Sequence, residues 1–254
     1  MKQINSKVIR NQKITSDFYE LEFSWDHEAG IPVPGQFLTI RVSHDTVPLL
    51  RRPFAFSAFN GETMSASIIY QKRGRATELL CSKEKGETLD LIGPLGNPFP
   101  KLPPQKAVLV AGGIGLGPVM FMVSDLLQKN QSVEFVFGCR NTHSVPDAQS
   151  FKRLQPVVCT DDGTAGFKGT VIDYLEEKGS VDSKSTIYCC GPHPMLKALN
   201  DLADTKKAQC FVSVEQVMAC GVGACMGCVV KTTTGYQRAC KEGPVFNSRD
   251  ILWE

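Results

Sequence analysis

Cysteine is distributed very unevenly along this chain. Four of the ten cysteines fall in the short stretch from residue 220 to residue 240, and the other six are scattered over everything before it. Their spacing is Cys220-x4-Cys225-x2-Cys228-x11-Cys240. Thiols clustered in this way, with small residues between them, indicate a loop that wraps closely around a metal or a metal cluster. The rest of the chain has to fold in a way that supports this loop.

A Cys-x4-Cys-x2-Cys run with a distant fourth cysteine is the spacing of plant-type [2Fe–2S] ligands. The small residues in the loop let backbone N–H groups point at sulfur and stabilise the charge of an anionic cluster. They are Gly221, Gly223, Ala224 and Gly227. Structural zinc more often uses separated Cys-x2-Cys pairs with histidine, and no histidine follows His193. The four cysteines are therefore candidate [2Fe–2S] ligands, with zinc or coincident structural thiols as the alternatives.

Composition narrows the class of protein. The chain has 254 residues, 42% of them hydrophobic, and 28 Lys+Arg balance 26 Asp+Glu. A net charge of +2 without a concentrated basic stretch argues against binding to nucleic acid or to an acidic membrane. The first twenty residues lack the apolar core of a secretory signal. We expect a soluble, cytoplasmic protein with no membrane span, whose cysteines are thiols rather than disulfides.

Residues 1 to about 100 have the pattern of short antiparallel strands. Apolar and polar residues alternate with a period of two in segments 17–25, 36–42, 63–71 and 87–92. Glycine and proline turns separate these segments, and one short helix is predicted at 76–82. Several short strands joined by such turns indicate an antiparallel β-barrel.

The pattern changes after a proline-rich segment at 100–106, which we interpret as a domain boundary. The apolar run 107–111 predicts a buried parallel strand, and a helix follows it. Further strands are predicted at 133–138, 155–160 and 185–190, with helices around 169–178 and 192–203. This alternation indicates a parallel sheet in an α/β domain. We expect a multidomain β plus α/β fold: a barrel at 1–100, an α/β domain at 101–210 and a cysteine-rich module at 211–254.

Glycines occupy the turn between the first strand of the α/β region and its helix, in VLVAGGIGLGP (108–118). Backbone N–H groups and the helix dipole hold a pyrophosphate at such a turn, so Gly112, Gly113 and Gly115 are candidate nucleotide-binding residues. The acidic residue that usually follows about 20 positions later is missing. A tight turn without a ligand is the alternative. Arg140 meets either a ribose phosphate or solvent, which leaves the choice between NAD and NADP open.

A second buried strand ends at Cys190, in YCCGPHPM (188–195). Ligands of a parallel sheet collect at the carboxyl ends of its strands, so we expect Cys190 to face whatever the glycine turn binds. This makes Cys190 a candidate catalytic residue. The alternative is a small buried apolar side chain.

The barrel region carries the motif LLRRPFAFSAF (49–59), followed by GRAT (74–77). An arginine and a helix N-terminus together form a natural diphosphate site. An aromatic ring such as that of Phe54 is suited to lie against a flat ligand. The alternative is a barrel strand with an arginine pair on its surface.

In this order, RRPFA, GRAT, GGIGLGP and YCCGPHPM resemble the ferredoxin-reductase flavoprotein superfamily along the whole chain. The segments ACGVGACMGCVV and GYQRACKEGPVF are similar to one of its families, the electron-transfer subunits of NAD-linked dihydroorotate dehydrogenase. The resemblance implies FAD on the barrel, NAD at the α/β domain and a [2Fe–2S] cluster on the C-terminal module.

The resemblance also assigns roles to single residues. It places Cys190 near the nicotinamide. The FAD contacts that it implies are Arg52, Pro53, Phe54, Ala55, Ile69, Tyr70, Gln71, Gly74, Ala76 and Thr77. One position departs from the family pattern, because Ala55 stands where a serine is expected near the flavin, with Ser57 two residues on. Either a backbone N–H or Ser57 replaces that hydrogen bond, or the flavin potential and hydride transfer differ.

By resemblance the chain is an oxidoreductase subunit in pyrimidine (UMP) biosynthesis. It would pass electrons from an FMN-containing dihydroorotate dehydrogenase catalytic subunit through [2Fe–2S] and FAD to NAD⁺, within a heterotetramer. FAD belongs between the other two groups because it exchanges two electrons with NAD and one with a cluster. One alternative is the small subunit of an NAD(P)H–ferredoxin oxidoreductase or of a sulfide dehydrogenase. Another is a nucleotide-binding regulatory module with a structural zinc tail.

Overall fold

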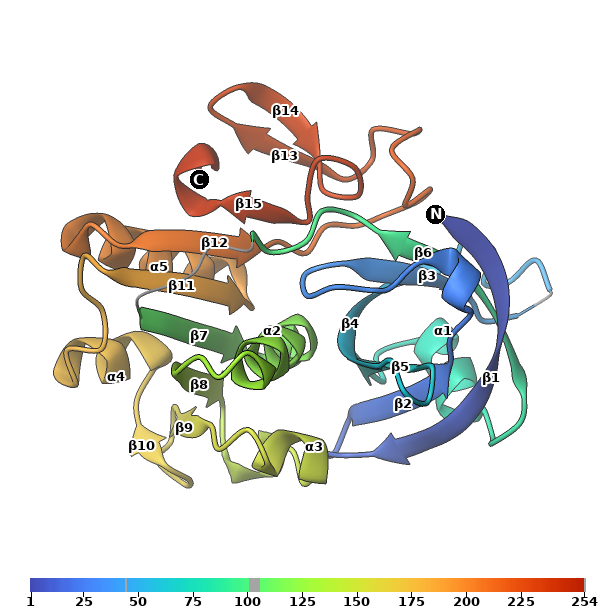
Figure 1. The fold of residues 1–254 in the computed structure, drawn as a ribbon, viewed down its shortest axis with the longest axis horizontal. Helices are drawn as coiled ribbons and strands as arrows, with labels where there is room; N and C mark the ends of the chain where they lie inside the picture. Colours follow the sequence, from blue (N-terminus) through green and yellow to red (C-terminus); the bar gives the residue numbers. More distant parts are fainter. Residues whose placement is uncertain (44, 101–105, 254) are drawn as a thin grey trace.

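The computed structural model describes residues 1–43, 45–100 and 106–253, so most of the predicted linker at 100–106 lies outside the described residues. Within them the chain forms a closed barrel, a seven-stranded sheet and a two-stranded sheet. Figure 1 shows the barrel beside the larger sheet, with the C-terminal segment above both. The predicted fold class, an antiparallel barrel with an α/β domain and a small C-terminal module, is confirmed.

Six antiparallel strands close the barrel in the order β1-β2-β5-β4-β3-β6. They are β1 (Lys2–Lys13), β2 (Phe18–Ser24), β3 (Phe37–Arg41), β4 (Arg52–Asn60), β5 (Ser65–Gln71) and β6 (Thr88–Leu95), with η1 (His27–Ala29) and α1 (Arg75–Cys81) between them. The four predicted segments are β2, β3, β5 and β6. Alternation did not identify β1, because the polar Ser6 stands between Ile4 and Val8 on its buried face and the apolar Ile9 is exposed.

The larger sheet has the order β10-β9-β8-β7-β11-β12-β15. Its strands are β7 (Lys106–Gly112), β8 (Val133–Cys139), β9 (Val157–Thr160), β10 (Phe167–Lys168), β11 (Ser185–Cys190), β12 (Gln209–Ser213) and β15 (Val245–Asn247). All neighbours are parallel except β12 and β15. The central strands are apolar on both faces, as the continuous runs in the sequence predict.

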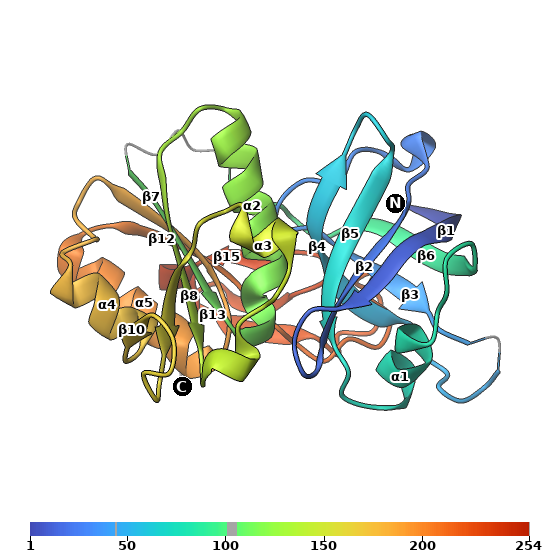
Figure 2. The same ribbon diagram turned by 90° about the horizontal axis from the view of Figure 1, so that it is seen from below.

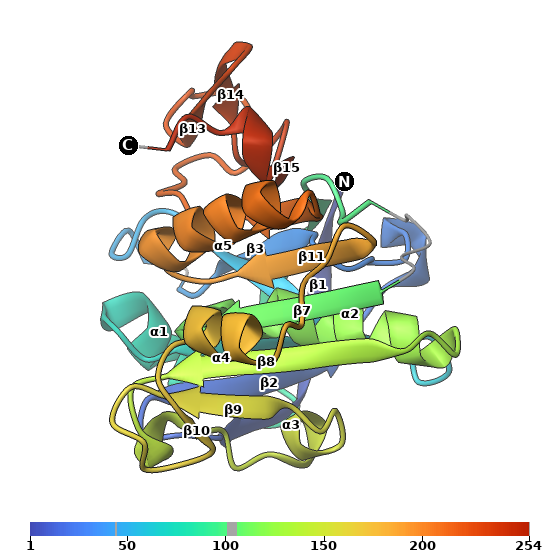
Figure 3. The same cartoon turned by 90° about the vertical axis from the view of Figure 1, so that its left-hand side faces the viewer.

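Helices cover both faces of this sheet (Figure 3). They are α2 (Leu116–Gln128), α3 (Gln149–Lys152), α4 (Val171–Glu177) and α5 (His193–Lys206), with short turns η2 (Gly113–Gly115), η3 (Thr142–Ser144) and η4 (Ser248–Asp250). One core lies under α2 and α3, and the other lies under α4 and α5. Figure 2 shows α2 between the sheet and the barrel, where it contacts β4 and β5. None of the described helices is long and apolar enough to cross a bilayer.

The C-terminal segment leaves the sheet at β12 and returns to it at β15. Between these strands lie the cysteine loop and a hairpin of β13 (Val229–Thr232) and β14 (Gly235–Arg238). Because β15 pairs antiparallel with β12, both ends of the segment are fixed to the same sheet edge. The loop itself lies over the end of the barrel that β3 and β6 form (Figure 1).

Candidate functional site

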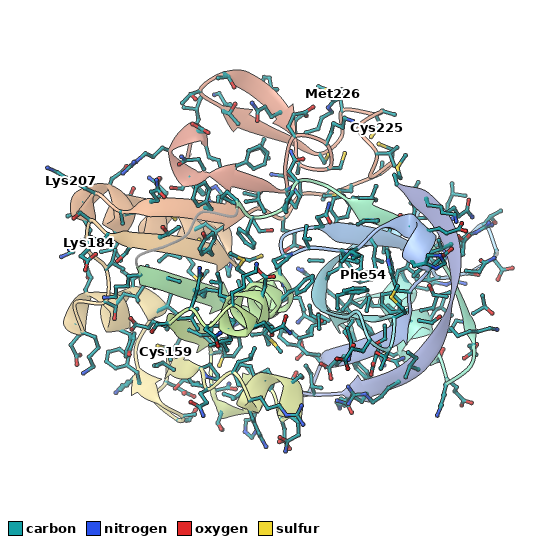
Figure 4. All side chains as sticks on the ribbon, in the orientation of Figure 1. Phe54, Cys159, Lys184, Lys207, Cys225 and Met226 are labelled. Carbon is teal, nitrogen blue, oxygen red and sulfur yellow. The ribbon has the colours of Figure 1, made fainter. Side chains whose placement is uncertain are left out.

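The structure brings the four clustered cysteines together as two pairs. The thiol of Cys220 is hydrogen-bonded to Cys225, and that of Cys240 to Cys228. Cys228 and Cys240 are buried, whereas Cys225 is exposed at the outer tip of the loop beside Met226 (Figure 4). No set of three or more His, Cys, Asp or Glu among the described residues converges on one metal position. Two pairs of thiols fit a cluster whose two irons each take two cysteines better than they fit one zinc ion.

Backbone N–H groups point at these sulfur atoms, as the small residues of the loop predict. The N–H of Gly223 donates to Cys240 Sγ at 3.1 Å, and the N–H of Cys240 donates to Cys228 Sγ at 3.4 Å. Burial acts to raise the pKa of Cys220, but hydrogen bonds from N–H groups of residues 222, 224 and 225 and from the Cys225 side chain outweigh it and lower that pKa to about 6. At Cys240 burial prevails and raises the pKa to about 12. The loop therefore favours the thiolate at Cys220.

An ion pair between Arg238 and Glu242 stabilises the cysteine loop. Arg238 binds Glu242 through a salt bridge, and Arg238 Nη1 also donates to the carbonyl oxygen of Gly223. The hydrogen bond from the Arg238 side chain lowers the pKa of Glu242 to about 2, so the pair stays charged at neutral pH. Gly223 has a φ of +84°, which residues with a side chain rarely adopt. The arginine thus links the turn after Cys240 to the loop that carries the first three cysteines.

The glycine turn after β7 and the segment after β11 meet at the carboxyl edge of the sheet. A Cβ atom at Gly115 would lie 2.2 Å from the carbonyl oxygen of Cys190, and one at Gly112 would lie 2.8 Å from Pro192 Cδ. Gly113 differs, because it has a φ of +52° and no atom lies within 4 Å of its Cβ position. Two of the glycines therefore permit close packing, and Gly113 leaves an open cradle before α2. A cradle of this kind fits the pyrophosphate of a dinucleotide.

Cys190 is half-buried and contacts residues that the sequence motifs did not identify. It pairs with Ser213 in β12, whose side chain hydrogen-bonds to the thiol, and Glu215 acts on it electrostatically. Burial is the main cause that raises the pKa of Cys190 to about 12, and the Ser213 hydrogen bond offsets it only in part. Cys190 is therefore a neutral thiol at neutral pH, suited to packing rather than nucleophilic attack. Ser213 ends β12 and Glu215 follows it, so both lie at the carboxyl edge of the sheet, where ligands of a parallel sheet collect.

Acidic residues also lie at the carboxyl edge of the sheet, where the glycine turn is found. They follow a neighbouring strand. Asp161 and Asp162 follow β9, and their N–H groups donate to the carbonyl oxygens of Cys139, which ends β8, and of Arg140, which follows it. Hydrogen bonds from the hydroxyl and N–H of Thr164 lower the pKa of Asp162. Two carboxylates and the guanidinium of Arg140 thus share this edge of the sheet, at the carboxyl ends of β8 and β9. A search for one acidic residue at a fixed spacing missed them, because they belong to the next strand.

The two arginines of the barrel motif differ in their contacts. Arg51 Nη2 forms a salt bridge with both carboxylate oxygens of Asp90 in β6, at 2.8 and 2.7 Å, and Nη1 donates to the Asp90 carbonyl oxygen at 2.9 Å. Arg52 donates to the carbonyl oxygen of Leu50, and we find no carboxylate partner for it within the described ranges. Arg51 therefore fixes the β3–β4 loop to the barrel, whereas Arg52 keeps its charge available for an anion such as a diphosphate.

Aromatic rings fill the barrel next to β4. The half-buried ring of Phe54 (Figure 4) lies edge-on to Tyr70 at a centroid distance of 5.9 Å. Tyr70 in turn stacks on Tyr19 at 5.6 Å. Tyr70 is fully buried, and its hydroxyl donates to Asn11 Oδ1 at 3.0 Å. The Tyr70 side chain therefore belongs to the barrel core, so that only its backbone is left to contact a cofactor.

The outer side of the same strands faces α2. Ile69 packs in the core under α2, and Gln71 is hydrogen-bonded to Asp17. Ser57 lies against the start of α2, where a Cβ at Gly117 would be 3.6 Å from Ser57 Cβ. The Ser57 hydroxyl is buried and has no hydrogen-bond partner among the described residues. Ser57 lies two residues beyond Ala55 on β4. A buried hydroxyl without a partner is what we expect on a strand that forms a hydrogen bond to a polar ligand.

The GRAT turn is closed by one side chain. Thr77 Oγ1 accepts from the N–H groups of Arg73 at 2.9 Å and Gly74 at 3.1 Å, and it donates to the Gly74 carbonyl oxygen. Ala76 is buried beneath the turn, and no atom lies within 4 Å of the Cβ position of Gly74. The turn is therefore anchored from below and open on its outer side, as a phosphate-binding turn requires.

Comparisons with known proteins identify both halves of this arrangement. The family described as "Oxidoreductase NAD-binding domain" matches residues 109–201, which include the glycine turn and Cys190. The family described as "Iron-sulfur cluster binding domain of dihydroorotate dehydrogenase B" matches residues 215–252, which include all four clustered cysteines.

Similarity to solved structures extends over nearly the whole chain. It superimposes with a TM-score of 0.85 and 26% identity on a structure described as an NADH-dependent reduced ferredoxin-NADP oxidoreductase, covering 98% of this chain and 90% of that one. Phthalate dioxygenase reductase, which links pyridine nucleotides to [2Fe–2S], shares the fold with a TM-score of 0.66, 17% identity and 94% coverage of each chain.

Sequence relatives are closer still. The chain is 36% identical over 259 residues to "Dihydroorotate dehydrogenase B (NAD(+)), electron transfer subunit" of Geobacillus sp. (strain WCH70), covering 99% of both chains. Proteins of the same name from Caldanaerobacter subterraneus and Bacillus pumilus are 37% identical, covering 99% of this chain and 99% and 98% of theirs. Full-length identity at this level, together with the matching cysteine module, shows that the chain belongs to the family of dihydroorotate dehydrogenase B electron transfer subunits.

Proposed function

We propose that this chain is the electron transfer subunit of an NAD-linked dihydroorotate dehydrogenase. It takes electrons from an FMN-containing catalytic subunit, where dihydroorotate is oxidised to orotate, and delivers them to NAD⁺ in cytoplasmic pyrimidine biosynthesis. The observation that carries the proposal is the pairing of four thiols beside a barrel and an NAD-type sheet, in a chain of this family. The assembly that we propose is a heterotetramer of the two kinds of subunit.

Each module has its own part in this proposal. Residues 1–100 bind FAD, with Arg52 and the 74–77 turn on the diphosphate. Residues 101–210 bind NAD on the open cradle at Gly113. Residues 211–254 bind the [2Fe–2S] cluster through the four cysteines. Open Cβ positions at Gly74 and Gly113 and the unpaired Ser57 hydroxyl support the two nucleotide assignments.

With these groups bound, the chain converts between hydride transfer with NAD and single-electron transfer with its partner. Its own residues position and shield the groups. Cys190 presents a neutral thiol at the edge where the sheet faces the barrel, and Ser213 holds that thiol in place. We assign no general base for dihydroorotate to this chain, because the substrate reacts on the catalytic subunit.

The surface around Cys225 supports docking of that subunit at the cysteine loop. Val217 is 86% exposed, Met226 is 51% exposed and Val222 is 38% exposed, and all three belong to the segment that carries the first three cysteines. Exposed apolar residues gathered around a loop of this kind are typical of a protein–protein contact. Docking here brings the partner close to the cluster that the loop binds.

The experiment that tests the proposal is anaerobic purification of the tagged chain from its own host, followed by assays of Cys225→Ala. We expect an FMN-containing subunit to co-purify and dihydroorotate to reduce NAD⁺. We expect Cys225→Ala to abolish that transfer while NADH still reduces artificial dyes through FAD. Loss of both activities from a variant that retains FAD contradicts this division of tasks.

One other function has a specific observation in its favour. The NADH-dependent reduced ferredoxin-NADP oxidoreductase structure matches nearly the whole chain at 26% identity. A small subunit of such an enzyme would bind the same cofactors, but it would co-purify with a large flavin and iron–sulfur subunit and show no activity with dihydroorotate. The same purification therefore separates the two functions.

A further inference from the structure

The cysteine loop is held by the barrel as well as by the sheet. On the sheet side, β15 pairs with β12 and the N–H of Val214 donates to the Pro244 carbonyl oxygen at 3.0 Å. On the barrel side, Gly96 lies against Pro244, and two side chains reach the segment that carries the cysteines: Asn97, just after β6, and Thr39 in β3. These two residues belong to no motif that the sequence analysis identified.

Asn97 binds the turn that directly follows Cys240. Its backbone N–H donates to the Gly243 carbonyl oxygen at 2.6 Å. Its side-chain amide donates to the carbonyl oxygens of Glu242 at 2.7 Å and Lys241 at 3.5 Å. One residue at the barrel end therefore engages three successive carbonyl groups of the tail.

The turn that Asn97 binds is connected to the other cysteines through Arg238. Glu242, whose carbonyl accepts from Asn97, has its carboxylate bound by Arg238. The same guanidinium donates to the Gly223 carbonyl, and the Gly223 N–H donates to Cys240 Sγ. A displacement of the turn is thus passed on to the loop that carries the first three cysteines.

Thr39 makes the second contact, near Cys220. It is buried, and its Cγ2 methyl would lie 3.0 Å from a Cβ at Gly221, the residue that follows Cys220. Thr39 also pairs with Pro53 across β3 and β4. Thr39 thus contacts the cysteine loop through its side chain and pairs through its backbone with the strand that we assign to FAD.

We propose that Asn97 and Thr39 are positioning residues that seat the iron–sulfur loop on the flavin barrel and thereby set the rate of electron exchange between the two. This inference rests on the proposed function. Neither side chain gains or loses an electron or a proton. Asparagine suits its place because its amide offers two N–H donors to two carbonyls, and threonine suits its place because its branched side chain is rigid.

The test uses the full-length protein loaded with its cofactors, with Asn97→Ala as the variant and Asn60→Ala as the matched control. Asn60 also stabilises a barrel turn, since its Oδ1 accepts from the N–H groups of Glu62 and Thr63, but that turn is remote from the tail in sequence and in the strand pairing. The protein is mixed rapidly with NADH under anaerobic conditions, and the rates of flavin reduction and of cluster reduction are measured separately from their absorbance. We expect Asn97→Ala to reduce flavin at the wild-type rate, with unchanged KM for NADH, and to reduce the cluster about tenfold more slowly.

A second pair of variants keeps the test decisive if Asn97→Ala loses iron. Thr39→Val retains the Cγ2 methyl and is expected to match the wild type, whereas Thr39→Ala removes it and is expected to slow cluster reduction. Cluster reduction at the wild-type rate in Thr39→Ala, or in Asn97→Ala that retains its iron, overturns the inference. Failure of NADH to reduce any cluster in the wild-type protein overturns the proposed function instead.

Discussion

Gly115 provides a direct test of the contact between the glycine turn and the Cys190 segment. Its φ of −62° suits any residue, so alanine at this position adds crowding without backbone strain. The new Cβ would lie 2.2 Å from the Cys190 carbonyl oxygen, 2.4 Å from its carbonyl carbon and 2.7 Å from the Gly191 nitrogen. These are backbone atoms, which no side-chain rotation can move away.

Relief of that crowding requires the ends of β7 and β11 to separate by roughly 1 Å, toward the usual spacing of nonbonded atoms. Overpacking of a rigid site costs about 3 kcal/mol. In a protein of this size that cost lowers the Tm by about 6–12 °C. A shift of about 1 Å at a reacting centre also lowers the rate of the chemical step by about a hundredfold. We therefore expect Gly115→Ala to melt early and to transfer hydride slowly.

Gly113→Ala is the matched control. No atom lies near its Cβ position, and only its φ of +52° opposes a side chain, which costs about 1 kcal/mol. Thermal unfolding followed by circular dichroism compares the two variants at equal FAD and iron content. Dye reduction by NADH compares Gly115→Ala with the wild type alone, because Gly113 belongs to the proposed NAD cradle. If Gly115→Ala melts no earlier than Gly113→Ala and reduces dye at the wild-type rate, the two strand ends are not in contact and the reasoning fails.

Two further predictions concern single side chains. Ala55→Ser restores the hydroxyl of the family pattern, and we expect a changed midpoint potential of the bound FAD in a redox titration; an unchanged potential means that another group already makes that bond. Asp173 and Thr170 form a capping box at α4, and the hydrogen bond from the Thr170 N–H lowers the pKa of Asp173 below 3.8. Its stabilisation is present above that pH and is lost as the pH falls through the lowered value. Asp173→Ala should therefore cost about 1 kcal/mol of unfolding free energy at neutral pH and almost nothing in strong acid; a constant difference across the pH range contradicts this.

The features that could be predicted from the sequence are those that depend on residues adjacent to one another in the chain. The strands with clean alternation, the apolar runs of the parallel sheet and the glycine turn all carry a local period or a local motif. The cysteine spacing is similarly local, and the structure confirms that N–H groups of the loop point at its sulfur atoms. Alternation did not predict strand β1, because one of its three buried residues is Ser6, so that its buried apolar residues are too few to show a period.

The features that the sequence could not predict depend on contacts between distant segments. Ser213 reaches Cys190 only because β12 lies beside β11, and Asp162 reaches Arg140 only because β9 lies beside β8. Asn97 has no motif of its own, since its partners follow Cys240 more than a hundred residues later. Loop closure across such distances leaves no period in the sequence, so these residues appear only once the topology is known.

The C-terminal module is the part of the chain least able to fold alone. Its hairpin has strands of four residues each, and an isolated two-stranded hairpin is at best marginally stable in water. Cys228, Val230 and Cys240 are instead buried in the same core as the strands and helices of the α/β domain. The position of the cysteines is therefore fixed by the folding of the sheet and the barrel, not by the module itself. An electron relay needs this arrangement, because a group placed by a rigid scaffold keeps its distance to the next group when a partner docks.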